Sequence, residues 1–179
     1  MTTGPEIREA GLADAPALAS LFMETWRDEY AGKLPEAVGA RSLAESEANW
    51  RRTLLGVAHG GPTVLVAGEG PLQGLIVGVR QASEWPGTAE VTLLQVARSS
   101  RRRGLGAALM REMAARLARA GAAALIVRVL EVNEGARRFY EALGAELTPL
   151  VRQVDESGIG FAERAYLWPD IGHVDGAPR

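Results

Sequence analysis

The chain has 179 residues, of which 47% are apolar and 23% charged, and its formal net charge is -2. This size and composition predict one globular domain over residues 1–179, with a core over residues 6–168 and a loose tail over residues 169–179. The near-neutral charge argues against nucleic acid as a partner. No apolar run approaches the length of a membrane helix or a signal sequence, so we expect a cytoplasmic protein without a membrane partner.

The sequence contains no cysteine, which excludes disulfides, thiolate metal sites and cysteine nucleophiles. The two histidines, His59 and His173, are far apart and lie in Gly-rich or tail-like surroundings. A histidine metal cluster or a Ser-His-Asp triad is therefore not predicted, and we expect no metal.

The N-terminal half is predicted to begin with a short strand over residues 6–10. A helix follows from Gly11 or Asp14 to about Tyr30, with Pro16 near its first turn. A second helical stretch is predicted over residues 36–55. Two strands, residues 63–68 and 72–81, are joined by Glu69-Gly70-Pro71 as a hairpin, and two glycines in the second strand, Gly74 and Gly78, leave room for a close neighbour.

The C-terminal half is predicted to alternate between strands and helices. A strand ending at Ala97 leads to a helix from Gly104 to a left-handed cap at Gly121. A strand over residues 123–130, a helix over residues 133–143 and two strands over residues 146–154 and 160–168 follow. This order predicts an α/β (α+β) fold with a mixed, mostly antiparallel sheet of about seven strands and about four helices on its two faces.

A basic glycine loop connects the central strand to the following helix. Glycine lets a ligand approach the main chain closely, and the N–H groups of the first helical turn have no intrahelical partner. Together with the helix dipole and the guanidinium groups, they favour an anion with several phosphate oxygens. The sequence therefore predicts a pyrophosphate site at Arg101, Arg102, Arg103, Gly104 and Gly106.

The loop differs from two other phosphate-binding loops. A dinucleotide-binding Gly-x-Gly-x-x-Gly/Ala turn requires a small third residue, but Leu109 occupies that position. A P-loop is excluded because no Gly-Lys-Ser/Thr follows. A solvated basic loop without a ligand stays open as the alternative.

The loop and its flanks resemble the signature of the GNAT superfamily of acyl-CoA-dependent N-acyltransferases. The detailed resemblance covers residues 89–147: Arg-x-x-Gly-x-Gly at 101–106, Leu-Gln-Val at 94–96 before it, and Asn133 and Phe-Tyr-Glu-x-Leu-Gly at 139–144 after it. The resemblance implies a central strand that splays from its neighbour, and acetyl-CoA as co-substrate in the resulting cleft. It also implies these cofactor contacts: Leu94, Gln95 and Val96 with pantetheine, the N–H groups of Arg102, Arg103, Gly104, Leu105, Gly106 and Ala107 with pyrophosphate, and Asn133 with the cofactor arm.

The resemblance further implies catalytic roles. Tyr140 matches the family's tyrosine near the thioester sulfur, where a phenol can protonate the leaving thiolate. Glu90 lies where histone-acetylating members carry their base, whereas members that acetylate ribosomal-protein N-termini place a Glu on the next strand, where this chain has Arg128. Either residue could also be structural: Tyr140 as a core aromatic and Glu90 as a strand-end carboxylate in solvent.

The acceptor is predicted to be a small-molecule or peptide amine, and Trp26, Tyr30 and Trp85 are candidates for the wall of its pocket because amine cations favour aromatic faces. A polyamine, an amino acid, an antibiotic and a protein amine all stay open. A catalytically silent acyl-CoA-binding module is the alternative to an enzyme, and a homodimer is open by analogy with the family.

Overall fold

The computed structural model describes residues 5–35, 42–57, 59–69, 71–82, 85–156 and 159–174. Seven strands form one sheet in the order β1-β2-β3-β4-β5-β7-β6. The strands are β1 (Ile7–Glu9), β2 (Thr63–Ala67), β3 (Gly74–Val79), β4 (Thr88–Val96), β5 (Ala124–Leu130), β6 (Glu146–Glu156) and β7 (Ile159–Trp168), and the helices are α1 (Ala15–Tyr30), α2 (Leu43–Val57), α3 (Leu105–Arg119) and α4 (Glu134–Ala142).

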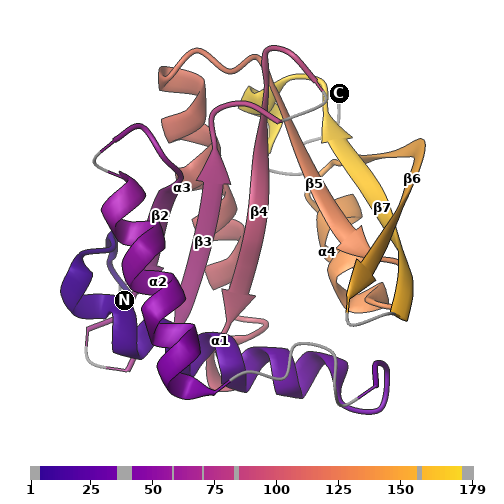
Figure 1. The fold of residues 1–179 in the computed structure, drawn as a ribbon. Coiled ribbons are helices and arrows are strands. Elements are labelled where there is room, and N and C mark those ends of the chain that lie inside the picture. The colour runs from indigo at the N-terminus through magenta and orange to yellow at the C-terminus, as the bar shows by residue number, and fades with distance from the viewer. Residues whose placement is uncertain are drawn as a thin grey trace.

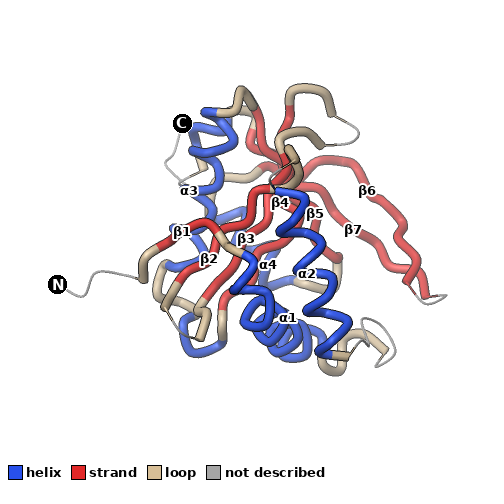
Figure 2. The backbone as a smooth tube through the Cα atoms, turned by 60° about the vertical axis from the view of Figure 1, so that its left-hand side comes forward, coloured by secondary structure: helices blue, strands red, loops and turns tan. Residues whose placement is uncertain are grey.

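The strand pairing confirms the predicted fold class. β4 and β5 run parallel, and the other neighbouring strands pair antiparallel. The helices lie on both faces of the sheet (Figures 1 and 2). One apolar cluster joins α3 to the sheet through Leu109, Met110 and Met113, which are all fully buried. A second cluster joins α1 and α2 to the opposite face.

The two parallel strands separate along their length, as the family resemblance implied. Their ladder joins Thr88 to Ala124 and ends at the pair Val91 and Val127. Beyond this pair the strands diverge into a V, and α1 lies across its open end (Figure 1). The end of β4 after Val91 thus pairs with β3 along one edge, whereas its other edge no longer pairs with β5.

Several predicted boundaries differ from the structure. The second helix begins at Leu43, and residues 36–41 of the prediction lie outside the described residues. The segment after β7 does not behave as a loose tail up to residue 174, because Ile171 and Val174 are buried in the cluster beneath α3. These two side chains remove apolar surface from water, which the polar composition of the segment concealed. Within the described ranges, no helix combines the length and apolarity that a membrane span requires.

The close approach expected at Gly78 is confirmed and gives a stability prediction. A Cβ at this position would lie 2.6 Å from Sδ of Met113 and 3.2 Å from a methyl carbon of Leu117, two fully packed side chains of α3. Gly78→Ala is expected to lower the free energy of unfolding by about 1–3 kcal/mol, since an overpacked core must shift its neighbours. Chemical denaturation measures this loss. Gly160→Ala is the matched strand control, because a Cβ there would meet no atom within 4 Å; an equal loss in both variants would contradict the packing explanation.

Candidate active site

The loop between β4 and α3 presents consecutive main-chain donors. Arg102 and Gly104 both have positive φ, 59° and 81°, and Gly104 precedes the first residue of α3. Within the part of the chain that the structure describes, no protein acceptor is found for the N–H groups of residues 102–107. We call these six groups the cradle. Unpaired donors at a helix N-terminus suit a phosphate group, as the sequence predicted.

The three arginines of the loop have different positions. Arg101 donates from Nε to the carbonyl oxygen of Val96 at 3.0 Å, and its Nη1 lies 3.8 Å from Oε2 of Glu29 on α1. Its side chain therefore ties the loop to β4 and to α1. Arg102 and Arg103 are both exposed, and of the two only Arg102 is among the described residues that line the cavity beside the cradle. An anion contact of the Arg103 guanidinium group stays a prediction.

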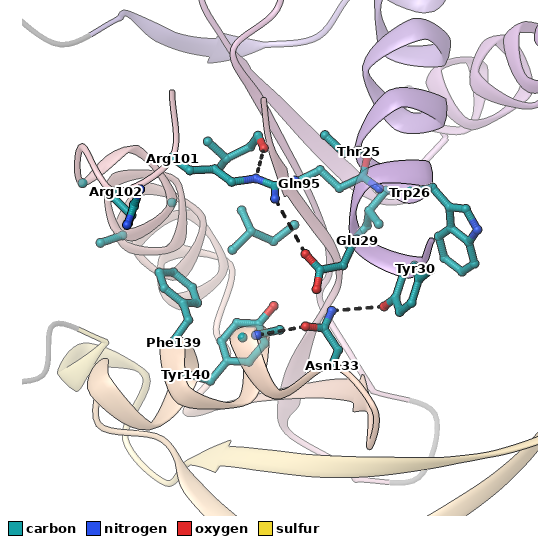
Figure 3. Close-up of a pocket in the computed structure, with 18 residues that line it drawn as sticks. Thr25, Trp26, Glu29, Tyr30, Gln95, Arg101, Arg102, Asn133, Phe139 and Tyr140 are labelled. Atoms are coloured by element: carbon teal, nitrogen blue, oxygen red, sulfur yellow. Dashed lines mark hydrogen bonds and ion pairs between the residues drawn. The ribbon is translucent and has the colours of Figure 1, made fainter. Parts of the chain in front are cut away.

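A cavity of about 720 Å³ extends from the cradle along the diverging edge of β4 (Figure 3). Its walls come from β4 and the loop that follows it, and from α1 and α4, which are far from them in the sequence. Leu105, by contrast, turns its side chain into the core, so only its main chain belongs to the cradle. The described residues that line the cavity are Thr25, Trp26, Glu29, Tyr30, Leu93, Leu94, Gln95, Val96, Arg101, Arg102, Gly104, Gly106, Ala107, Asn133, Gly135, Ala136, Phe139 and Tyr140.

Three features of this cavity suit a long, polar, extended ligand. The edge of β4 that leaves the ladder with β5 exposes main-chain groups at residues 93–96, which an extended amide chain can pair with. The side-chain oxygen of Gln95 is buried without a protein partner in the described chain. Gly106 allows a narrow passage, since a Cβ there would lie 3.3 Å from the ring of Phe139. The cavity therefore fits a chain with amide groups that ends in phosphate.

Tyr140 occupies the inner end of the cavity. Only 6% of the residue is exposed, and its ring packs against Phe139, Tyr166 and Trp168 with centroids 5.3–6.4 Å apart. No described group forms a hydrogen bond with its hydroxyl, which points into the cavity (Figure 3). Burial raises the pKa of the phenol, and the nearby Tyr30 adds to the shift. The group is thus a rigidly held, protonated donor at neutral pH.

Asn133 connects α4, which carries Tyr140, to α1. Its Oδ1 accepts a hydrogen bond from the N–H of Ala136 at 3.0 Å, so it caps α4. Its Nδ2 donates to the hydroxyl of Tyr30 on α1 at 3.2 Å (Figure 3). The side chain also lines the cavity, so the cap and a ligand contact are compatible, as expected from the sequence.

Asn133→Ala is expected to lower the free energy of unfolding by about 1–2 kcal/mol, because it removes the cap and leaves the hydroxyl of half-buried Tyr30 without this donor. Thermal or chemical denaturation measures the loss. Tyr30→Phe removes the link to α1 while retaining the cap. It should therefore cost less than Asn133→Ala, and a larger cost would show that the cap contributes little.

A second cavity of about 360 Å³ adjoins the first. It lies in the V between β4 and β5, and residues 154, 161 and 163 of β6 and β7 close its far side. The two cavities share Trp26, Tyr30, Leu93, Leu94, Asn133, Ala136 and Tyr140. The Tyr140 hydroxyl is therefore placed where a ligand in one cavity can react with a ligand in the other.

Glu90 is not among the described residues that line either cavity. Its Oε1 accepts a hydrogen bond from Nη1 of Arg128 at 2.6 Å, and the Glu90 and Arg128 side chains are only 13% and 7% exposed. Arg128 itself lines the second cavity. A base role for Glu90 stays a prediction. In the structure its carboxylate is paired with the guanidinium group of Arg128, and Arg128 lies in the wall of the second cavity.

The three aromatic residues predicted for the acceptor pocket separate into two groups. Trp26 and Tyr30 line both cavities, with ring centroids 4.4 Å apart. Trp85 instead packs against Ala82, Ile126 and Ala165 and does not appear in the described lining of either cavity. The ring of Trp85 thus lies against β5 and β7.

Sequence reasoning missed cavity-lining residues on the last two strands and on α1. Val154 of β6 and Phe161 and Glu163 of β7 line the second cavity. Thr25 and Glu29 of α1 line the first cavity. No motif surrounds these residues. The alternation along β7 could have shown which of its residues share a face, but not that this face closes a cavity. In the described ranges, no group of three His, Cys, Asp or Glu side chains is arranged to hold a metal ion.

Comparisons with known proteins agree with this geometry. The model of the acetyltransferase (GNAT) family matches residues 17–145. Among curated proteins, no sequence matches the chain. The solved structures that share the fold include three acetyltransferases that are named by their activity or substrate. They are the PaiA N-acetyltransferase of Thermoplasma acidophilum in complex with coenzyme A (TM-score 0.70, 20% identity, covering 90% of this chain and 98% of that one), a ribosomal-protein-alanine N-acetyltransferase of Brucella melitensis (0.68, 22%, 91% and 98%), and a phosphinothricin acetyltransferase of Sinorhizobium meliloti with acetyl-CoA (0.68, 18%, 94% and 89%).

Proposed function

Since this chain belongs to the acetyltransferase (GNAT) family, we propose that it transfers the acetyl group of acetyl-CoA to a primary amine by direct attack in a ternary complex. The observation that carries the proposal is the position of Tyr140 at the junction of two adjoining cavities. One cavity is long and ends at phosphate-binding donors, and the other is short and closed by the last strands. This division matches a reaction between a large donor and a smaller acceptor.

The residues of the first cavity fit acetyl-CoA. The cradle offers six N–H groups to the pyrophosphate, and Arg102 lies beside them. The open edge at Leu94, Gln95 and Val96 offers main-chain groups to the amides of the pantetheine arm, and Asn133 lies further along the same cavity. Holding the donor along its whole length positions the thioester and lowers the entropic cost of the reaction.

Tyr140 supplies the acid. The amine nitrogen forms a bond to the thioester carbon while the carbon–sulfur bond breaks, and the departing sulfur takes the proton of the Tyr140 hydroxyl. Burial makes this phenol a weaker acid than in water, but a thiolate in the same buried cavity is desolvated as well and binds a proton more strongly. The two increases in pKa, of the phenol and of the thiol, therefore offset each other. The phenol stays protonated until the negative charge develops on the sulfur.

Titration of the purified chain with acetyl-CoA, followed by a panel of amines while free thiol is measured, tests the proposal. Micromolar binding of acetyl-CoA and thiol release that depends on the amine are expected. Binding without thiol release on any amine would favour a catalytically silent acyl-CoA-binding module. A larger thermal stabilisation by NAD than by CoA at equal concentrations would contradict the assignment of the cradle, because the ligand that binds the folded state more tightly raises the melting point more.

A further inference from the structure

The second cavity has a charge pattern that defines its ligand. Among its described lining residues only Arg128 and Glu163 are charged, and the remainder are largely apolar or aromatic. Arg128 already donates to Glu90. The carboxylate of Glu163 is thus the negative group on the described wall of this cavity, and it lies among side chains that include Phe161, Tyr30 and Trp26.

Glu163 is held in place by one of its two oxygens. It lies on β7 opposite Leu130 of β5, and its side chain is 18% exposed. Its Oε2 accepts hydrogen bonds from Nη2 and Nε of Arg152 at 2.7 and 3.0 Å. No donor in the described chain contacts the other oxygen, Oε1. A carboxylate fixed in this way can receive one further donor from the cavity.

The field of Glu163 reaches the junction of the two cavities. Burial raises the pKa of the Tyr30 hydroxyl, the hydrogen bond from Asn133 opposes this shift, and the carboxylates of Glu29 and Glu163 add to it. Tyr30 lines both cavities beside Tyr140. Glu163 is therefore close enough to act electrostatically on the place where the acceptor must meet the donor.

We propose that Glu163 binds the ammonium group of the acceptor and takes its first proton, and that the acceptor is a primary monoamine with a short apolar body. This inference rests on the proposed acetyl transfer. The aromatic faces of Phe161, Tyr30 and Trp26 favour a cation, and Leu130 and Val154 favour an apolar chain. The described wall offers no second carboxylate to a diamine, and Arg128 disfavours another positive charge.

The proton balance is as follows. The oxygen Oε1 of Glu163 accepts one proton from the ammonium group and leaves a neutral amine, whose electron pair forms the bond to the acyl carbon. The sulfur departs with the electron pair of the carbon–sulfur bond and takes a proton from Tyr140. The positively charged nitrogen of the new amide then loses its second proton, which restores the Tyr140 hydroxyl. Glu163 releases its proton to solvent, so each turnover yields one amide, one thiol and one proton.

Hexylamine hydrochloride is the probe for this site. Isothermal titration calorimetry with the full chain, in the presence and absence of CoA, is expected to show binding that Glu163→Gln weakens about 10- to 100-fold, because a charge-assisted hydrogen bond is lost. Glu163→Asp should recover part of the affinity. 1,6-Diaminohexane should bind more weakly than hexylamine, and sodium hexanoate should not bind.

The variant Arg152→Gln distinguishes whether Glu163 binds the amine or only stabilises the pairing of β6 with β7. It breaks the same ion pair between β6 and β7 but keeps the Glu163 carboxylate, so hexylamine affinity should stay within about threefold of wild type. In the thiol assay, Glu163→Gln should raise KM for the amine and lower kcat, while CoA affinity stays unchanged. Equal effects of the two variants, or no binding of hexylamine to the wild type, would overturn the inference. Failure of the acetyl transfer itself would instead appear as absent thiol release by a wild type that still binds hexylamine.

Discussion

Replacing Tyr140 by Phe is expected to lower kcat about 100- to 1000-fold while the affinity for acetyl-CoA changes little, because a positioned general acid contributes a rate factor of this order. The ring of Phe can keep the packing of Tyr140 against Phe139, Tyr166 and Trp168. The hydroxyl that is lost has no hydrogen-bond partner in the described chain, so folding should not suffer. Steady-state thiol release, with calorimetry for acetyl-CoA, measures the two quantities separately.

Tyr166→Phe is the matched control for this variant. The Tyr166 hydroxyl donates to Glu141 at 2.9 Å and accepts from Arg137 at 3.1 Å, and Tyr166 lines neither cavity as described. Its loss should affect stability and leave kcat near wild type. Since burial raises the pKa of Tyr140, titration of this phenol should not lower wild-type kcat as the pH rises toward about 10. An unchanged rate for Tyr140→Phe would exclude Tyr140 as the acid.

Replacing Gly104 by Val is expected to weaken acetyl-CoA binding about 100-fold. Gly104 has φ of 81°, which a β-branched residue scarcely adopts, so the loop must turn its peptide groups away from their present directions. The donors of the cradle would then no longer converge, and losing one or two charge-assisted hydrogen bonds costs about 1.5–3 kcal/mol each. Calorimetric titration with CoA measures the effect directly.

Gly121→Val provides the same backbone conflict at the other end of α3. Gly121 has φ of 97°, and a Cβ at either glycine would meet no atom within 4 Å, so the two substitutions cause comparable local strain. Only Gly104 belongs to the cradle. Gly121→Val should therefore destabilise the fold and retain CoA affinity. If both variants lost affinity equally, general destabilisation rather than the cradle would explain the result.

Glu90 and Arg128, which the sequence analysis treated separately, form an ion pair in the structure. The sequence suggested Glu90 as a base and treated Arg128 as a departure from one substrate class. In the structure each is the other's partner, with both side chains mostly buried. Breaking such a pair from one side leaves a buried charge uncompensated. The pair thus forms part of the wall of the second cavity, which Arg128 lines.

Much of the architecture follows from local sequence patterns. The strand, basic glycine loop and helix from β4 to α3 were predictable because apolar alternation, two glycines and helical periodicity are all local signals. Asn133 as a cap and Gly121 as a helix end were predictable for the same reason, and the structure confirms both. Each depends on the backbone of a few neighbouring residues. Gly78 indicated only that a close neighbour would fit, and the fold places Met113 and Leu117 of α3 there.

The tertiary structure alone decided which side chains share a cavity. Glu163 on β7 and Tyr30 on α1 are separated by most of the chain, and their proximity depends on the strand order β5-β7-β6 and on the point where β4 and β5 separate. Trp85 was expected in the acceptor pocket and packs elsewhere, because a turn can direct its ring to either side of the sheet. Periodicity specifies the face of each element, whereas the meeting of distant faces is set by the packing of the whole core.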